Sequence, residues 1–160
     1  MSDLAPPSPE DNRGRVGPVA RTLGFAGLLP QFAAVWLSWH GRPEFGPGPG
    51  HQFAYIYGAL ILSFVGGMWW GVAMRRTTGQ NRLVTIAVMP SLVAFFIAFA
   101  FSLYGGTFRI PLFVLGAALI LTLPIDRHLF HTGEAPIGWM ALRVPLSIGL
   151  GVLTILAGLA

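Results

Sequence analysis

Four polar side chains in the last third of the sequence are of types that do chemistry: Asp126, His128, His131 and Glu134. Carboxylates and imidazoles move protons and bind divalent metals. The two histidines are three residues apart, but no third ligand has a fixed place beside them. Gly133 and Pro136 also disfavour a helix through the segment. We therefore expect polar loop residues at a membrane interface, with neither a metal site nor a catalytic residue.

The composition excludes several other chemistries. The chain contains no cysteine, which excludes disulfides, cysteine metal sites and thiolate catalysis. It contains no lysine for a Schiff base or a phosphate-binding loop. Nucleophile elbows, dinucleotide fingerprints and His-Glu-x-x-His runs are also missing from the sequence. We expect no cofactor, and all six acidic residues fall in segments predicted to be tails or loops, which argues against an ion-coupled carrier.

The balance of hydrophobic and charged residues is typical of a membrane protein. Hydrophobic residues make up 54% of the chain and charged residues 10%, against about 25% charged in soluble domains. The net charge is +4, and the arginines lie singly or in small groups beside apolar runs. This pattern favours contact with anionic lipid headgroups over nucleic acid. The expected partners are membrane lipids and either other membrane proteins or further copies of this chain.

Five apolar segments approach the length of about 20 residues that crosses a bilayer as a helix. They cover residues 23–39, 53–74, 83–104, 110–125 and 138–160, and the fourth is short. The sequence thus predicts an all-α, polytopic membrane helix bundle with five transmembrane helices in a single domain, residues 18–160. Residues 1–17 are rich in Pro, Ser, Gly and acidic residues and are predicted to be a disordered tail. Residues 41–50 are predicted to form a Pro/Gly loop.

The arginines predict how the chain is oriented. With the N-terminus in the cytoplasm, eight of the ten arginines lie on the inner side, and Arg42 and Arg109 lie outside. Cytoplasmic loops are generally enriched in basic residues, so this split predicts a multi-pass inner-membrane protein with its C-terminus outside. If the fourth segment did not span, the split would fall to six against four.

Glycine, tryptophan, proline and arginine residues of three predicted helices fall at one depth, in the inner third of the bilayer, and Asp126 and Arg127 lie at its edge. This hypothetical binding site comprises Gly67, Trp69, Trp70, Pro90, Asp126, Arg127 and Arg143. Small residues would let backbones approach, and the tryptophans would wall a pocket. A charge inside the bilayer is costly, so Arg143 either snorkels to the headgroups, pairs with Asp126, or holds an anion or lipid headgroup.

The second predicted helix carries small residues at four-residue spacing: Ala59, Ser63, Gly67 and Gly71. In membranes such a stripe lets a neighbouring helix approach closely. Two interpretations are open, packing against another helix of the same chain and formation of a homodimer.

Residues 57–71 read YGALILSFVGGMWWG. This run resembles the signature of domain of unknown function 3429, a family of bacterial membrane proteins that also takes in a small mitochondrial protein, transmembrane protein 69. Residues 23–30, the Asp126-Arg127 pair, and Trp139, Arg143 and Pro145 fit the same resemblance. It implies a small helical inner-membrane protein and supplies no activity or functional residue.

Three functions remain open on the sequence alone. The absence of catalytic motifs favours a membrane scaffold or an assembly and interaction protein. The residues in the inner third favour, as an alternative, a protein that binds or transports a lipid or small molecule. A third hypothesis is an intramembrane enzyme that uses the four polar residues of 126–134.

Overall fold

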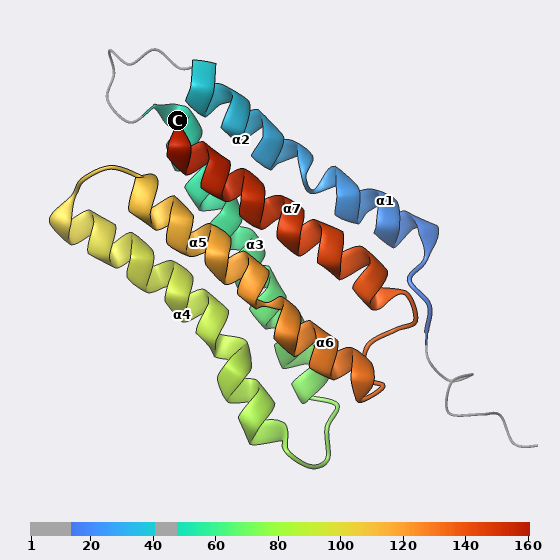
Figure 1. Ribbon diagram of the computed structural model, residues 1–160. Helices are drawn as coiled ribbons and strands as arrows, with labels where there is room; N and C mark the ends of the chain where they lie inside the picture. The colour runs from blue at the N-terminus through green and yellow to red at the C-terminus, as the bar shows by residue number, and fades with distance from the viewer. Residues whose placement is uncertain (1–13, 41–47) are drawn as a thin grey trace, which may run out of the picture.

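The computed structural model describes residues 14–40 and 48–160, and within these ranges the chain folds as a helical bundle (Figure 1). The helices are α1 (Pro18–Ala26), α2 (Leu29–His40), α3 (Pro49–Ala73), α4 (Gln80–Tyr104), α5 (Arg109–Leu121), α6 (Leu123–His131) and α7 (Trp139–Leu159). The all-α prediction is confirmed. Most of the predicted 41–50 loop lies outside the described residues, but its last two residues already belong to α3, which begins at Pro49.

Four helical stretches are long and apolar enough to cross a membrane, which indicates a multi-pass membrane protein. They are α3, α4, α7, and α5 together with α6 as one stretch, Arg109–His131. The predicted first span, residues 23–39, is instead divided between α1 and α2. This pair runs alongside α7 from one end of the bundle to the other (Figure 1).

A proline and a tyrosine account for the break between α1 and α2. Pro30 is the second residue of α2, where its missing N–H is tolerated, but its ring disfavours continuation of a helix from the preceding turn. The N–H of Gly27 ends α1 by bonding to the carbonyls of Leu23 and Gly24. The carbonyl of Gly27 accepts a hydrogen bond from the hydroxyl of Tyr57 on α3. The N–H and the carbonyl of Gly27 at the break therefore both have hydrogen-bond partners inside the bundle, as a low-dielectric environment requires.

The fourth predicted span is longer than the sequence suggests. Pro124 lies in the first turn of α6, so the helix restarts directly after Thr122 and runs to His131. The expectation that the polar residues from Asp126 to Glu134 lie in a loop is therefore wrong for residues 126–131. It also follows that Asp126 lies on a helix within an apolar stretch, which corrects the expectation that all acidic residues lie in tails or loops.

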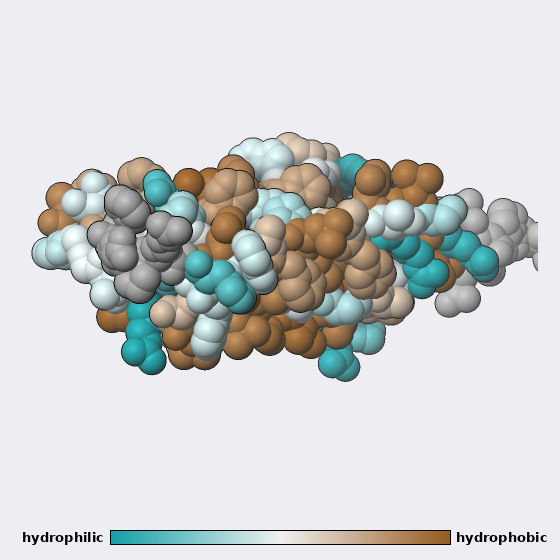
Figure 2. Space-filling model, turned by 90° about the horizontal axis from the view of Figure 1, so that it is seen from above, coloured by the Kyte–Doolittle hydropathy of each residue, from teal (hydrophilic) through white to brown (hydrophobic). Residues whose placement is uncertain are grey.

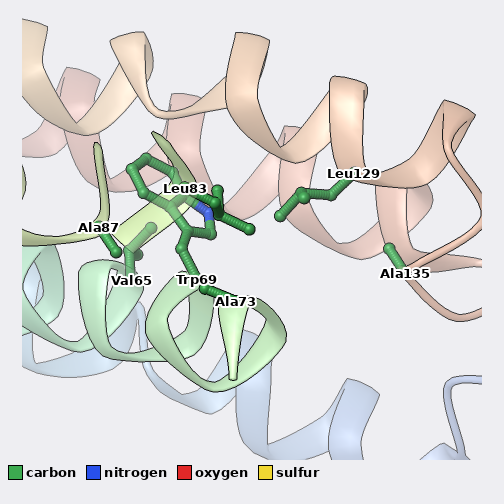
Figure 3. Packing of buried hydrophobic residues seen from close by; sticks show 7 residues of the cluster. All are labelled: Val65, Trp69, Ala73, Leu83, Ala87, Leu129 and Ala135. Atoms are coloured by element: carbon green, nitrogen blue, oxygen red, sulfur yellow. The ribbon is translucent and has the colours of Figure 1, made fainter. Parts of the chain in front are cut away.

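Buried hydrophobic residues connect the helices at the end of the bundle that carries the α3–α4 and α6–α7 loops. One cluster draws on α3, α4, α6 and the segment after α6 (Figure 3). Its members are Val65, Trp69, Ala73, Leu83, Ala87, Leu129 and Ala135. Elsewhere α5 and α7 approach at two glycines, since a Cβ on Gly116 would lie 2.6 Å from the carbonyl oxygen of Gly151.

The outer surface of the bundle is also apolar. Phe64, Phe95, Phe96 and Leu60 are among the large hydrophobic side chains that are more than half exposed. Hydrophobic residues cover much of the middle of the molecule, and hydrophilic residues lie mainly toward its ends (Figure 2). Such a surface fits hydrocarbon rather than water.

The second half of the small-residue stripe on α3 packs against no other helix of the described chain. Gly67 and Gly71 are exposed, and a Cβ on either would meet no atom within 4 Å. The close approach is made by the adjacent residue, Gly66, where a Cβ would collide with the carbonyl oxygen of Ala87 on α4. The interpretation that α3 packs closely against another helix of the same chain is therefore wrong for Gly67, and it holds for Gly66 instead.

The segment before α1 is tied to the loop before α7. Arg15 and Ile137 form a parallel bridge, in which the N–H of Val16 donates to the carbonyl of Ile137 and the N–H of Ile137 to that of Gly14. Residues 14–17 of the predicted disordered tail therefore have defined backbone partners. The prediction for residues 1–13 lies outside the described residues.

Candidate functional site

Asp126 and Arg143 form an ion pair inside the bundle. Nε of Arg143 donates to Oδ2 of Asp126 at 2.7 Å. The exposed fraction of Asp126 is 0% and that of Arg143 is 6%. Asp126 comes from the first turn of α6 and Arg143 from the second turn of α7. Of the alternatives for Arg143, the structure shows the ion pair.

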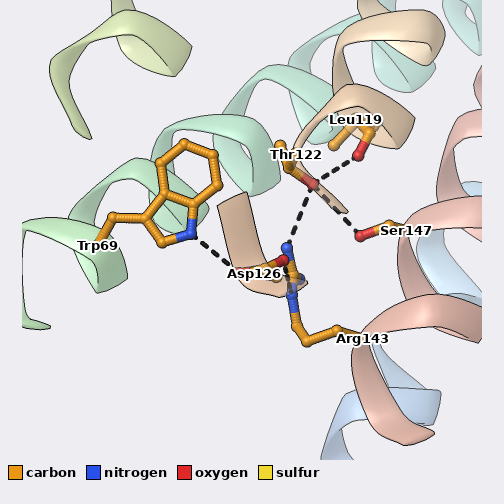
Figure 4. Close-up of polar contacts among 6 residues, drawn as sticks. All are labelled: Trp69, Leu119, Thr122, Asp126, Arg143 and Ser147. Carbon is orange, nitrogen blue, oxygen red and sulfur yellow. Dashed lines mark hydrogen bonds and ion pairs between the residues drawn. The ribbon is translucent and has the colours of Figure 1, made fainter. Parts of the chain in front are cut away.

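Three further polar side chains surround this ion pair (Figure 4). The buried charge cluster so formed comprises Trp69, Thr122, Asp126, Arg143 and Ser147. Nε1 of Trp69 on α3 donates to Oδ1 of Asp126 at 2.9 Å. Nη2 of Arg143 donates to the hydroxyl of Thr122 at 3.4 Å, and that hydroxyl lies 3.5 Å from the hydroxyl of Ser147. Both carboxylate oxygens thus have a donor, and the donors come from two different helices.

The geometry makes the cluster electrically neutral and tightly bonded. Burying a single ion in a low-dielectric medium costs several kcal/mol. Removing one partner of a buried ion pair therefore destabilises a protein by about 3–5 kcal/mol, because the other charge is left unpaired. Here the two charges cancel, and hydrogen bonds to ionised groups are shorter and stronger than neutral ones. The ring of Trp139 adds a weaker contact, with its centroid 5.9 Å from Cζ of Arg143.

The structure brings together three of the seven residues that the sequence places in a hypothetical inner-third site: Trp69, Asp126 and Arg143. Pro90 is buried on α4, where it faces Gly66 rather than the charge cluster. The remaining three residues, Gly67, Trp70 and Arg127, are exposed on the outside of the bundle. They do not wall a common pocket with the charge cluster.

A comparison with known protein families covers the whole described bundle. The sequence profile of the family described as "Protein of unknown function (DUF3429)" matches residues 16–159. The chain belongs to the DUF3429 family. This match confirms the family resemblance of residues 57–71. No curated protein and no solved structure matches the chain.

Two residues of the cluster in this DUF3429 protein have no counterpart among the residues singled out from the sequence. Thr122 lies four residues before Asp126, and Ser147 lies four residues after Arg143. Residues four apart share a helix face, so the spacing contains the signal. The four-residue spacing indicates a shared face only when a helix is predicted through residues 122–126.

The other polar residues of the 126–134 segment lie apart from the cluster. Glu134 accepts two hydrogen bonds from Arg76, from Nε at 2.8 Å and from Nη2 at 2.7 Å. His128 and His131 are exposed, and Nε of Arg127 lies 3.3 Å from Nε2 of His131. Within residues 14–40 and 48–160, no three His, Asp or Glu side chains gather as a metal site would require.

A second buried polar contact joins α2, α3 and α7 of the DUF3429 bundle. Nε2 of Gln31 donates to the hydroxyl of Thr154 at 2.8 Å and lies 3.4 Å from the carbonyl oxygen of Ala54. Gln31 and Thr154 both have an exposed fraction of 0%. The contact holds α2 to the bundle one residue after Pro30, next to the break. Both buried polar groupings thus join helices that are far apart in the sequence.

Proposed function

We propose that this DUF3429 protein is a multi-pass protein of the bacterial inner membrane that acts as a scaffold or as an assembly and interaction protein. The observation that carries the proposal is the exposed half of the small-residue stripe of α3. Gly67 and Gly71 lie one turn apart on the exposed side of a long apolar helix, and nothing in the described chain covers them. In a bilayer, small residues at this spacing are where the backbone of another helix approaches.

The bonding of the acidic residues supports a role that is not catalytic. Asp126 and Glu134 are the two acidic residues in the described ranges, and each accepts a hydrogen bond at 2.7 Å from an arginine. A general acid or base needs a side chain that is free to exchange a proton with substrate. The pairing of both carboxylates supports instead a role in holding helices together.

We further propose that the chain crosses the membrane five times, with its N-terminus in the cytoplasm. The broken α1–α2 pair runs the length of the bundle and would supply the fifth crossing beside the four apolar stretches (Figure 1). Seven arginines of the described residues lie in or next to segments at the end that carries the α3–α4 loop: Arg15, Arg21, Arg75, Arg76, Arg82, Arg127 and Arg143. Arg109 lies at the opposite end. This asymmetry supports a cytoplasmic assignment for the arginine-rich end.

Site-specific photocrosslinking in native membranes tests the interaction proposal. A photoreactive phenylalanine analogue replaces Phe64, an exposed residue of α3 three positions before Gly67, in one variant and Phe96, an exposed residue of α4, in a control variant. We expect a covalent protein adduct of discrete mass from position 64 and only lipid adducts from position 96. Gly67→Ile should remove the adduct from position 64, because its branched side chain prevents the partner's backbone from approaching the adjacent stripe.

Two outcomes would contradict this proposal. One is formation of lipid adducts alone from position 64, as from position 96. The other is an adduct from position 64 that Gly67→Ile leaves unchanged, which would mean that the partner does not approach through the small-residue stripe.

A further inference from the structure

A groove lies between the first two turns of α4 and the face of α6 beside them, with a volume of about 300 Å³. Leu83, Ile86 and Ile125 make its walls apolar. Arg76, Arg82 and His128 line its other part. None of the residues of the buried charge cluster lines this groove, so it is a separate feature of the fold.

The polar part of the groove is cationic. Arg82 is exposed in the first turn of α4, a turn that contains no acidic residue. His128 is exposed on α6 across the groove, and Arg76 is fixed in place by its two hydrogen bonds to Glu134. Within the described chain, no ion pair occupies the guanidinium of Arg82. An anion therefore finds an available positive charge here.

The cationic and apolar parts of the groove are arranged along the helix axis. From Gly79 to Ile86 the helix rises about 10 Å, at 1.5 Å per residue. Arg82 lies near the helix end and Ile86 one turn further into the bundle. If the arginine-rich end faces the cytoplasm, Arg82 lies at the depth of the headgroups and Ile86 at the depth of the acyl chains.

We propose that this groove binds one acidic phospholipid of the cytoplasmic leaflet, with its phosphate at Arg82 and His128 and an acyl chain against Ile86 and Ile125. The argument is charge complementarity combined with depth. The cytoplasmic leaflet carries the anionic lipids, and basic pockets between membrane helices on that side bind their headgroups. The proposal goes beyond the interaction function and does not depend on it; it rests on the proposed orientation of the chain.

Native mass spectrometry of the full chain in detergent tests the site. The protein is titrated with phosphatidylglycerol and, separately, with phosphatidylcholine of identical acyl chains. We expect one molecule of phosphatidylglycerol to be retained in preference to phosphatidylcholine. Arg82→Gln should weaken phosphatidylglycerol binding about fivefold, the effect of one arginine near an anionic membrane surface.

Arg21→Gln is the matched control. Arg21 is an exposed arginine at the same end of the molecule, on α1, and its loss changes the net charge by the same amount. We expect this variant to bind phosphatidylglycerol as the unmodified chain does. Glycerol phosphate, which has the phosphate but no acyl chain, should not displace the bound lipid.

Any of three results would overturn the proposal. Equal retention of the two lipids would show that the groove does not recognise charge. Equal weakening by Arg82→Gln and Arg21→Gln would assign the effect to overall surface charge. Displacement by glycerol phosphate would identify a site for a soluble anion instead of a lipid. Equal melting temperatures of the two variants confirm that both are folded.

Discussion

At the scale of single residues, Asp126 is held by donors from two helices. Nε of Arg143 on α7 and Nε1 of Trp69 on α3 each bond to a different carboxylate oxygen. In an apolar bundle, water does not solvate either charge, so each charged side chain depends on its partner for stabilisation. The cluster thereby links α3, α6 and α7 at one point.

This arrangement predicts non-additive effects of substitution. Arg143→Leu should lower the free energy of unfolding by about 3–5 kcal/mol, because it leaves the buried carboxylate of Asp126 unpaired. Asp126→Asn should also destabilise, and the double variant should be less unstable than the sum of the two single variants. Thermal or denaturant unfolding in detergent measures all three.

Arg127→Leu provides the control for this cycle. Arg127 neighbours Asp126 in the sequence but is exposed, so its substitution should change stability by less than about 0.5 kcal/mol. Arg143→Leu with as small an effect as Arg127→Leu would mean that the ion pair does not stabilise the fold.

Part of this site is predictable from sequence. An arginine inside an apolar segment requires a partner, and Asp126 is a candidate from the sequence alone. Trp69 is harder to assign, because an interfacial tryptophan and one that donates to a buried carboxylate look the same in a sequence. Thr122 is missed because the predicted fourth helix ends at residue 125, so Asp126 is assigned to a loop and the two residues are not expected to share a helix face.

At the scale of helices, α3 shows why a glycine pair does not reveal which of its members packs. Gly66 and Gly67 are adjacent and point about 100° apart around the helix, since a turn contains 3.6 residues. The four-residue repeat of small residues passes through Gly67, yet α4 approaches α3 at Gly66. A repeat of small residues predicts a face for close approach without saying whether the partner belongs to the same chain.

The two glycines therefore predict opposite responses to alanine. Gly66→Ala should lower stability by about 1–3 kcal/mol, because the added methyl group collides with the carbonyl oxygen of Ala87. Gly67→Ala should be neutral or stabilising by up to about 1 kcal/mol through helix propensity. Melting temperatures in detergent compare them, and a larger loss at Gly67 would contradict the register of α3 against α4.

The prolines of α2 and α6 also show the limits of local sequence signals. Both lie at the second position of a helix, but the chain breaks before α2 and continues almost directly into α6. Before α2, Gly27 ends α1, and its carbonyl finds a donor in Tyr57. Before α6, Thr122 donates to the carbonyl of Leu119 and keeps the turn helical. These differences depend on tertiary partners, which a single sequence does not show.

At the scale of the whole molecule, the bundle places the described ends of the chain far apart. The segment before α1 is bonded to the loop between α6 and α7, and the C-terminus lies at the opposite end, beside the α4–α5 turn (Figure 1). Apolar lengths predict α3, α4 and α7 well, since each is one long helix. The number of crossings depends on the broken α1–α2 pair, which neither length nor hydropathy settles.

Labelling of single introduced cysteines tests the central claim, a chain that crosses the membrane five times with its N-terminus inside. The protein contains no cysteine, so each variant carries one reactive thiol. The variants Gly14→Cys, Thr78→Cys and Thr132→Cys probe one end of the bundle, and Thr107→Cys and Ala160→Cys the other. A membrane-impermeant maleimide added to right-side-out vesicles should label positions 107 and 160, and should label positions 14, 78 and 132 only after permeabilisation. Labelling of positions 14 and 160 from the same side would contradict five crossings.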